Sequence, residues 1–410
     1  MRTSQVVDAV TARVDRFLTP ERLRLYPLAF LTVGALTLAA ITILGLARPT
    51  ALPGGMAPDF LAHWTGGQLM VHDPARLYDT AAQAQVEHRG PSASLAWFVS
   101  PPFVAGLNVP LALLPYRAAA FLWLCLSLVA LWFSFGLLRG WAPDLIDRAR
   151  VPVLIALASY EPVLELLGSG QDSAVILLCW VAGTAALARR RPLAGGAVLG
   201  FAVMKPQLIV FVPLVLLVRR EWRGLLGFFV ISAAALLGSA LLVGTGGISA
   251  WVHVLTSGSY DTAVTKSQSW KMASLPALVQ SLAPGVGGVA AVVLAVVGAG
   301  VVAWAATRAT GYGVWAITLL VTCAVSPHLV VYDLVIALPA VVWLVDAAGS
   351  ARLRTVLVAA YLLPWTVPVT HILAEGHSGW SWIGAPWQAI PIALLAVCAI
   401  RVGTNGDSTA

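Results

Sequence analysis

The chain has 410 residues, 59% of them hydrophobic and only 10% charged, whereas an ordinary soluble domain is about 45–50% apolar and about 25% charged. This composition excludes a water-soluble globule, and the mean hydropathy of +0.85 indicates a polytopic membrane protein. The net charge of +7 does not indicate a nucleic-acid partner, because the basic residues form short clusters between apolar runs. The four cysteines lie singly within apolar runs and are interpreted as small buried hydrophobes.

Unbroken apolar runs of about 20 residues predict an all-α protein, since a β-barrel would show alternating segments of about ten residues. The arginine-bearing segment 1–25 predicts a cytoplasmic interfacial helix, followed by one transmembrane domain over 26–401 and a cytoplasmic tail at 402–410. The apolar stretch around Lys205-Pro206 predicts two short helices that meet there. Further spans are expected near 26–46, 117–138, 151–167, 172–188, 225–243, 287–307, 312–325, 329–345, 355–372 and 386–400, about 10–12 in all.

The positions of the basic residues predict the orientation of these spans. With both termini in the cytoplasm, only seven of the 25 lysines and arginines fall outside, as the positive-inside rule requires. The seven are Arg48, Arg76, Arg89, Arg117, Lys205, Lys266 and Lys271. All seven histidines fall on this outer face too, chiefly in long loops at 47–116 and 244–275. We therefore expect the chemistry of the protein at the outer face of the plasma (inner) membrane.

The first outer loop contains a predicted short interfacial helix that begins near Asp59. Helical spacing brings Asp59 beside His63, with Gly66 and Gly67 expected to leave room for a ligand. The opposite face is expected to meet the bilayer with Phe60, Leu61, Trp64 and Leu69. An equally open interpretation makes Asp59 a simple helix N-cap after Pro58.

For other polar residues, too, the sequence allows both a structural and a functional role. Capping is the favoured role for Asp79, at the start of another short helix, and for Asp172, which follows Gln171 in a glycine-rich turn. An ammonium at Lys205 costs about 3 kcal/mol in a membrane unless it finds a cavity or a partner, or snorkels to the surface. Glu161 and Glu165, four residues apart in or near a span, receive no partner from the sequence.

Over residues 26 to about 345 the chain resembles glycosyltransferase family 87, the polyprenol-phosphate-mannose-dependent α-1,2-mannosyltransferases of the GT-C fold. The resemblance lies in an ordered set of motifs, since each motif alone is weak. It departs from the family at His63-Trp64, where Tyr-Trp is frequent, and at Ser100-Pro101-Pro102, where Tyr-Pro-Pro is typical. The set comprises Asp59-Phe60, His63-Trp64, Gly66-Gly67, Leu77-Tyr78-Asp79, Pro101-Pro102-Phe103, Pro110-Leu111-Ala112-Leu113-Leu114-Pro115, Gly170-Gln171, Ala194-Gly195 to Gly200, Lys205-Pro206 and Ser326-Pro327-His328.

The resemblance implies inverting transfer from a lipid-linked sugar, with Asp59 as the base that removes the proton of the acceptor hydroxyl. A phosphate leaving group needs cations in place of an acid, and the candidates are Lys205, His328, Lys266 and Lys271. Candidate sugar-binding residues are His63, Trp64, Gln171, Tyr260 and Trp270, although interfacial aromatic belts are common. We expect no metal and no cofactor, because no HExxH or DxD-type cluster is present.

The expected partners are a polyprenyl-phosphate sugar donor, a glycolipid or lipoglycan acceptor and membrane lipid. Composition rich in alanine, valine and arginine suggests an actinobacterial source and phosphatidylinositol mannoside assembly. An alternative is the same fold with another lipid-linked sugar, such as arabinose. A transporter or lipid flippase is the main alternative, although the chain shows no internal repeat and its polar residues gather at one face. A non-catalytic scaffold subunit is a further possibility.

Overall fold

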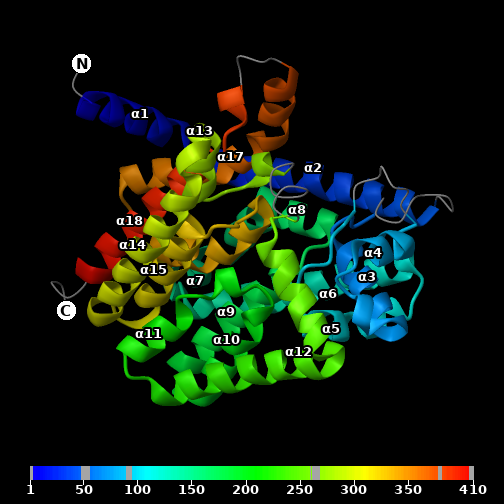
Figure 1. Ribbon diagram of the computed structural model, residues 1–410. Helices are drawn as coiled ribbons and strands as arrows, with labels where there is room; N and C mark the ends of the chain where they lie inside the picture. Colours follow the sequence, from blue (N-terminus) through cyan, green and yellow to red (C-terminus); the bar gives the residue numbers. More distant parts are fainter. Residues whose placement is uncertain are drawn as a thin grey trace.

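The computed structural model describes residues 3–47, 56–88, 95–258, 260, 268–376 and 381–405. These residues form α-helices and short 3-10 helices, with one isolated bridge between Met272 and Val330 and no strand. The all-α prediction is therefore confirmed. The α-helices of Figure 1 are α1 (Thr3–Phe17), α2 (Pro20–Ala47), α3 (Phe60–His72), α4 (Thr80–Val86), α5 (Pro102–Ala112), α6 (Tyr116–Leu137), α7 (Pro143–Ala158), α8 (Glu161–Ser169), α9 (Ser173–Ala188), α10 (Pro192–Phe201), α11 (Val212–Val218), α12 (Trp222–Thr256), α13 (Leu275–Leu282), α14 (Gly287–Arg308), α15 (Gly311–Val325), α16 (Leu338–Ala347), α17 (Ala351–Gly376) and α18 (Ala389–Asn405).

Six helical segments of the described chain are long and apolar enough to cross a membrane, which confirms a polytopic membrane protein. They contain α2, α6, α12, α14, α17 and α18. The α7 and α8 pair gives a seventh if the two are counted as one bent span. The shorter apolar helices α9 and α15 correspond to the spans expected at 172–188 and 312–325, and both are largely buried in the protein.

Several predicted boundaries differ from the structure. The span expected at 329–345 is the 3-10 helix η8 (Val331–Ala337) followed by α16. The single span expected at 151–167 is divided into α7 and α8, which meet at 52° across Ser159 and Tyr160. The outer loop expected from residue 244 is instead helical to Thr256, because α12 passes through a kink at Gly244 and then continues. Gly244 has φ of +66°, which a glycine adopts without strain, so the apolar sequence beyond it can resume a helix.

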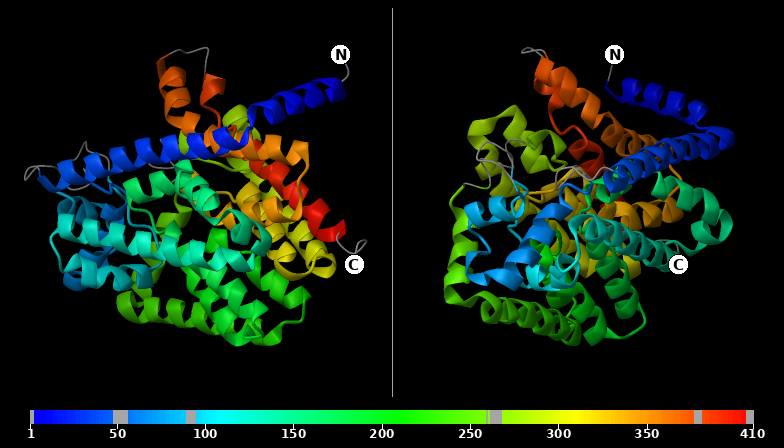
Figure 2. Two further views of the ribbon diagram at one scale, coloured as in Figure 1. Left: turned by 180° about the vertical axis from the view of Figure 1, so that it is seen from behind. Right: turned by 90° about the vertical axis from the view of Figure 1, so that its right-hand side faces the viewer.

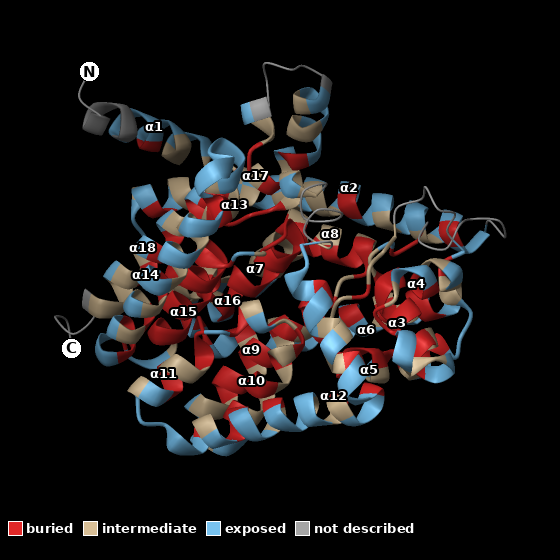
Figure 3. Ribbon diagram, in the orientation of Figure 1, coloured by how far each residue is buried: buried red, intermediate tan, exposed pale blue. Residues whose placement is uncertain are grey.

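The helices surround a buried centre formed by α9, α15 and the 3-10 helix η8 (Val331–Ala337) (Figure 3). In Figure 1, α3 to α6 lie on one side of this centre and α14 and α18 on the other, while α12 runs beneath them beside α10. Two further views show α2 crossing the outside of the bundle (Figure 2), where its side chains are mostly exposed. This exposure suits a helix that faces lipid.

The prediction for α3 is wrong in two respects. Phe60 and Leu61 are fully buried in protein and Leu69 is 5% exposed, so these side chains are not available to the bilayer. Its glycines permit close packing rather than a ligand site, because a Cβ on Gly66 would lie 2.6 Å from the Phe98 ring. The spacing of polar residues predicted one polar face and one lipid-facing face for α3, but contacts with other helices bury most of its residues on both faces.

Helices α10 and α12 pack backbone against backbone. A Cβ on Gly196 would lie 1.8 Å from the carbonyl oxygen of Gly224, and one on Gly200 would lie 2.4 Å from that of Phe228. Small residues at such contacts let membrane helices approach closely. This contact fixes α10, and with it the start of the chain break at Lys205.

We predict that Gly196→Val will disrupt this packing, because no backbone adjustment within two tight helices accommodates the added carbons without separating them. Overpacking of this kind costs about 1–3 kcal/mol. The expected result is a lower melting temperature of the detergent-solubilised protein. Gly238→Val on α12 is the matched control, since a Cβ there has no atom within 4 Å, and an equal loss in both variants would contradict the packing argument.

Candidate active site

The site is built on the turn between α8 and α9. Gly170 has φ of +78°, and its carbonyl oxygen accepts a hydrogen bond of 2.8 Å from Trp123 Nε1. A Cβ on Gly170 would lie 2.7 Å from those of Ala57 and Phe60, so only glycine allows the first outer segment to approach this closely. The Asp59 amide then donates to the Ser169 carbonyl oxygen at 2.9 Å. These contacts bring Asp59 beside Gln171.

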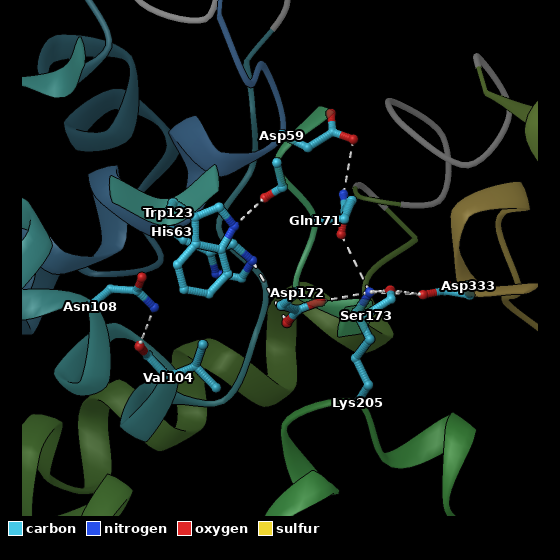
Figure 4. A network of polar contacts seen from close by, with 11 residues as sticks. Asp59, His63, Val104, Asn108, Trp123, Gln171, Asp172, Ser173, Lys205 and Asp333 are labelled. Atoms are coloured by element: carbon cyan, nitrogen blue, oxygen red, sulfur yellow. Dashed lines mark hydrogen bonds and ion pairs between the residues drawn. The ribbon is translucent and has the colours of Figure 1, made fainter. Parts of the chain in front are cut away.

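Asp59 is held by Gln171 and not by a capping bond. It occupies the N-cap position of α3, but its side chain accepts no cap hydrogen bond, so the simple N-cap interpretation is wrong. Gln171 Nε2 donates to Asp59 Oδ2 at 2.9 Å, and Gln171 Oε1 accepts from Lys205 Nζ at 3.3 Å (Figure 4). The lysine therefore fixes which end of the amide faces Asp59. Within the described part of the chain, Asp59 Oδ1 accepts no hydrogen bond, which leaves it open to a substrate hydroxyl.

The surroundings of Asp59 alter its protonation. Burial raises the pKa of Asp59 above its ordinary value, while the bond from Gln171 and the nearby charge of Lys271 act in the opposite direction. A carboxylate with a raised pKa is a better proton acceptor than a free aspartate. The arrangement thus favours a general base over a purely structural carboxylate.

Lys205 lies at the predicted helix break and is surrounded by carboxylates. The chain leaves α10 through the 3-10 turn η3 (Ala202–Met204), becomes non-helical at Lys205 and continues through η4 (Pro206–Leu208), which confirms the break. Lys205 Nζ lies 2.7 Å from Asp172 Oδ1 and 2.9 Å from Asp333 Oδ1, and it donates to Ser173 Oγ at 3.0 Å. Ser173 Oγ in turn donates to Asp333. The ammonium neither snorkels nor stands alone.

Asp172 therefore does not cap α9. Its side chain makes no capping bond and instead joins the buried charges, with Lys205 on one side and His63 Nε2 at 3.8 Å on the other. Burial lowers the pKa of His63 below its ordinary value although Asp172 pulls in the opposite direction, so the imidazole is neutral near pH 7. By contrast, Asp79 does cap α4, accepting from the amides of Ala81 and Ala82, as predicted.

Lys271 forms a second, more accessible cationic group. It lies at the end of η6 (Ser269–Lys271), where its Nζ contacts Glu165 Oε1 at 2.7 Å and lies 5.1 Å from the centre of the Trp270 ring. Trp270 stacks on His371 of α17 with ring centres 4.1 Å apart. The structure therefore identifies Lys271 as the partner of Glu165, which the sequence alone did not indicate.

Of the remaining candidate residues, His328 and Tyr260 lie near the segment that carries Lys271, whereas Trp64 does not serve the site directly. The Met272–Val330 bridge and a bond from the Ala273 amide to the Leu329 carbonyl pair the segments that carry Lys271 and His328. The Tyr260 ring lies 6.2 Å from that of His328. Trp64 forms a structural contact instead, because its Nε1 donates to the Leu114 carbonyl oxygen at 3.1 Å. Lys266 lies outside the described residues.

Comparison with known proteins supplies the family. The model of glycosyltransferase family 87 matches residues 98–327, which is more than half of the chain. The chain belongs to glycosyltransferase family 87. No curated protein and no solved structure gives a match.

Membership of family 87 makes this protein a membrane glycosyltransferase, and the site contains groups suited to that chemistry. The family match includes Gln171, Lys205 and Lys271, whereas Asp59 and His328 lie outside it. No three His, Cys, Asp or Glu side chains of the described chain gather in an arrangement that could hold a metal ion. The positioned groups are a carboxylate, an amide and two lysines.

Sequence reasoning did not assign three residues to the cluster around Lys205. Asp333 lies within an apolar run, and the cost of a charge there was a signal that it needs a partner. Ser173 carried no signal, because serine is common at helix starts. Asp172 was noticed but assigned to capping, since both roles place an acidic residue before a helix.

We predict that Lys205→Met will strongly destabilise the protein. Removing the ammonium leaves the buried carboxylates of Asp172 and Asp333 uncompensated, at a cost of about 3–5 kcal/mol. The measurement is the melting temperature in detergent. The triple variant Lys205→Met/Asp172→Asn/Asp333→Asn should recover much of the loss, because no unpaired charge remains.

Lys271→Met provides the matched control for this cluster. Its ion pair with Glu165 is partly exposed, so its removal should change stability by less than about 1 kcal/mol. Equal destabilisation by the two single variants would contradict the distinction between a buried and an accessible lysine.

Proposed function

We propose that the protein is an inverting mannosyltransferase that uses a polyprenyl-phosphate-mannose donor, with Asp59 as the catalytic base. The observation that carries this proposal is the Asp59 carboxylate itself: one oxygen is held by Gln171 at 2.9 Å, and the other accepts no bond from the described residues. A helix cap or an ion-pair carboxylate would use its oxygens internally. A base must keep one oxygen for the substrate.

The reaction is a single displacement at the sugar. Asp59 removes the proton of the acceptor hydroxyl while that oxygen forms a bond to the anomeric carbon. The bond between this carbon and the phosphate oxygen breaks, and its electron pair leaves with polyprenyl phosphate. One carboxylate suffices, because the leaving phosphate is a stable anion and needs cations instead of an acid.

We assign the donor phosphate to Lys271 and His328, which lie on paired segments. Lys271 has a single, partly exposed carboxylate partner, whereas Lys205 lies between two buried carboxylates. An ammonium already outnumbered by carboxylates offers little net attraction to another anion. We therefore propose Lys205 as a positioning residue that acts through Gln171, and Lys266 stays a candidate from its sequence position alone.

A groove beside this cation suits the lipid chain of the donor. Its volume is about 280 Å³, and it lies between α17 and the segment around η9 (Ser381–Gly384). It is lined by Leu363, Thr366, Val367, Thr370, Trp382, Ile383, Ala385, Trp387 and Gln388. Thr370 precedes His371, which stacks on Trp270 next to Lys271, and Gln388 donates to the Met272 carbonyl oxygen. These contacts connect the lining of this mainly apolar groove to the segment that carries Lys271.

Side-chain contacts support an outer-face location for this site, with both termini in the cytoplasm. Arg354 pairs with Asp15 at 2.8 Å, and Arg219 donates to the Ala309 carbonyl oxygen at 2.9 Å. Each contact joins two segments that the positive-inside rule assigns to the cytoplasm. Gln171, Lys205 and Lys271, which lie near Asp59, come from segments assigned to the opposite face.

The sugar and the acceptor rest on the family resemblance. Mannose, an α-1,2 linkage and a glycolipid or lipoglycan acceptor of the phosphatidylinositol mannoside type are what it implies. Gln171 and the neutral His63 supply hydrogen-bonding groups beside Asp59, and Trp270 and Tyr260 supply aromatic faces near the proposed phosphate site. Trp64, bonded to Leu114, is assigned to holding the first outer segment.

We predict that Asp59→Asn will lower the rate of mannosyl transfer by about 100- to 10,000-fold, the range of general-base contributions. Asparagine can still accept the bond from Gln171, so the melting temperature should change little. The assay follows radiolabelled mannose from polyprenyl-phosphate-mannose into extracted glycolipids, in membranes containing each variant. Asp79→Asn, which alters the cap of α4 and the ion pair with Arg76, is the matched control.

The wild-type pH profile gives a second readout of the same group. Because burial raises the pKa of Asp59, activity should fall on acidification at a pH above the ordinary aspartate value, as the base becomes protonated. Undiminished transfer by Asp59→Asn would remove Asp59 from the mechanism. Absence of transfer by the wild type would remove the proposed donor or acceptor.

The groove yields a separate prediction. Thr366→Trp should fill it and reduce kcat/KM for a donor with a long prenyl chain by about tenfold, while a donor with one or two isoprene units should be affected far less. Val369→Trp, on an exposed position of α17 outside the groove lining, is the control. Equal loss with both donors would show that the variant damages the site and does not block a lipid chain.

A further inference from the structure

The two lysines near Asp59 are held in different ways. Lys205 has a side chain that is 14% exposed, between Asp172 at 1% and Asp333 at 2%. Lys271 is 25% exposed and its partner Glu165 is 28% exposed. Breaking a buried pair leaves charges that water cannot reach, whereas a partly exposed pair contributes little and separates easily. An arriving anion would therefore compete for Lys271 before Lys205.

Glu165 occupies the position that such an anion would need. Its Oε1 lies 2.7 Å from Lys271 Nζ, on the helix that leads directly to Gln171. Glu165 also lies near enough to Asp59 to influence its charge, as does Lys271. In the structure the proposed phosphate cation is thus covered by a carboxylate of the protein itself.

Resting on the proposed function, we propose that Glu165 is an exchangeable counter-ion of Lys271, which the donor phosphate displaces and which returns to expel the product. The donor is a phosphodiester with one negative charge. The product is a phosphomonoester, whose charge near pH 7 is about −1.5 to −2. Lys271 alone would therefore hold the product more tightly than the donor. A carboxylate that competes for the same ammonium limits product inhibition.

This role requires that Glu165 can leave Lys271 without a large penalty. Both side chains retain access to solvent, and Lys271 Nζ lies over the Trp270 ring, a cation–π contact that does not depend on Glu165. Glu161, one turn earlier on α8, has a buried Oε2 without a hydrogen-bond partner among the described residues.

The test is the affinity of the full-length protein in nanodiscs for decaprenyl phosphate, with decaprenol as the uncharged control ligand. Lys271→Met should weaken decaprenyl phosphate binding about tenfold or more. Glu165→Gln and Glu165→Ala should tighten it about two- to fivefold, the range that a partly exposed ion pair contributes. The double variant Glu165→Gln/Lys271→Met should bind like Lys271→Met. Glu221→Gln, which removes an exposed charge at the start of α12, should bind like the wild type.

The sign of the Glu165 effect decides the inference. If Glu165 merely supports Lys271, its substitution will weaken binding, and weaker or unchanged binding in both Glu165 variants overturns the proposal while leaving the proposed function intact. If Lys271→Met binds as tightly as the wild type, the phosphate assignment of the proposed function fails instead. In turnover assays, Glu165→Gln should show stronger inhibition by added decaprenyl phosphate and a lower kcat.

Discussion

The structure around the site depends on one ammonium that lies between two buried carboxylates. Lys205 lies in an apolar stretch where an unpaired charge would be costly, and its neutralisation requires Asp172 from the α8–α9 turn and Asp333 from η8. These segments lie far apart in the sequence, and the ammonium pairs with a carboxylate from each. Gln171, the neighbour of Asp172, is thereby fixed with its amide toward Asp59. A charge that destabilises the helix in isolation thus orders the proposed base.

Close packing of small residues supports this arrangement from two sides. The backbone contact between α10 and α12 sets the place where α10 ends, just before Lys205. The contact of Gly170 with Ala57 and Phe60 sets how near the first outer segment comes to the α8–α9 turn. Since a Cβ at either place would clash with other atoms, a larger residue would force the packed segments apart at both contacts. The site is therefore positioned by the packed parts of the protein and not by a free loop.

Sequence reasoning predicted the helices well, because apolar length and proline breaks are local properties. It predicted the break at Lys205 and the cap at Asp79 for the same reason. It failed where the outcome depends on distant partners. The spacing of Asp172 before α9 is the same for a cap and for an ion pair, and the apolar face of α3 is the same toward lipid and toward Phe98 or α5. Likewise, Glu165 has no basic neighbour in the sequence, and its contact with Lys271 arises only from the fold.

On the proposed function, the two lysines near Asp59 do different work. One must hold the structure of the site whether or not substrate is present, and a lysine already outnumbered by buried carboxylates does this because substrate cannot compete for it. The other must bind an anion and release it in each cycle, which requires a weak, accessible partner. Lys205 and Lys271 have these contrasting environments within reach of the same aspartate. If both lysines were equally buried, the product would have no route to exchange, and if both were equally accessible, Asp59 would lose the amide that orients it.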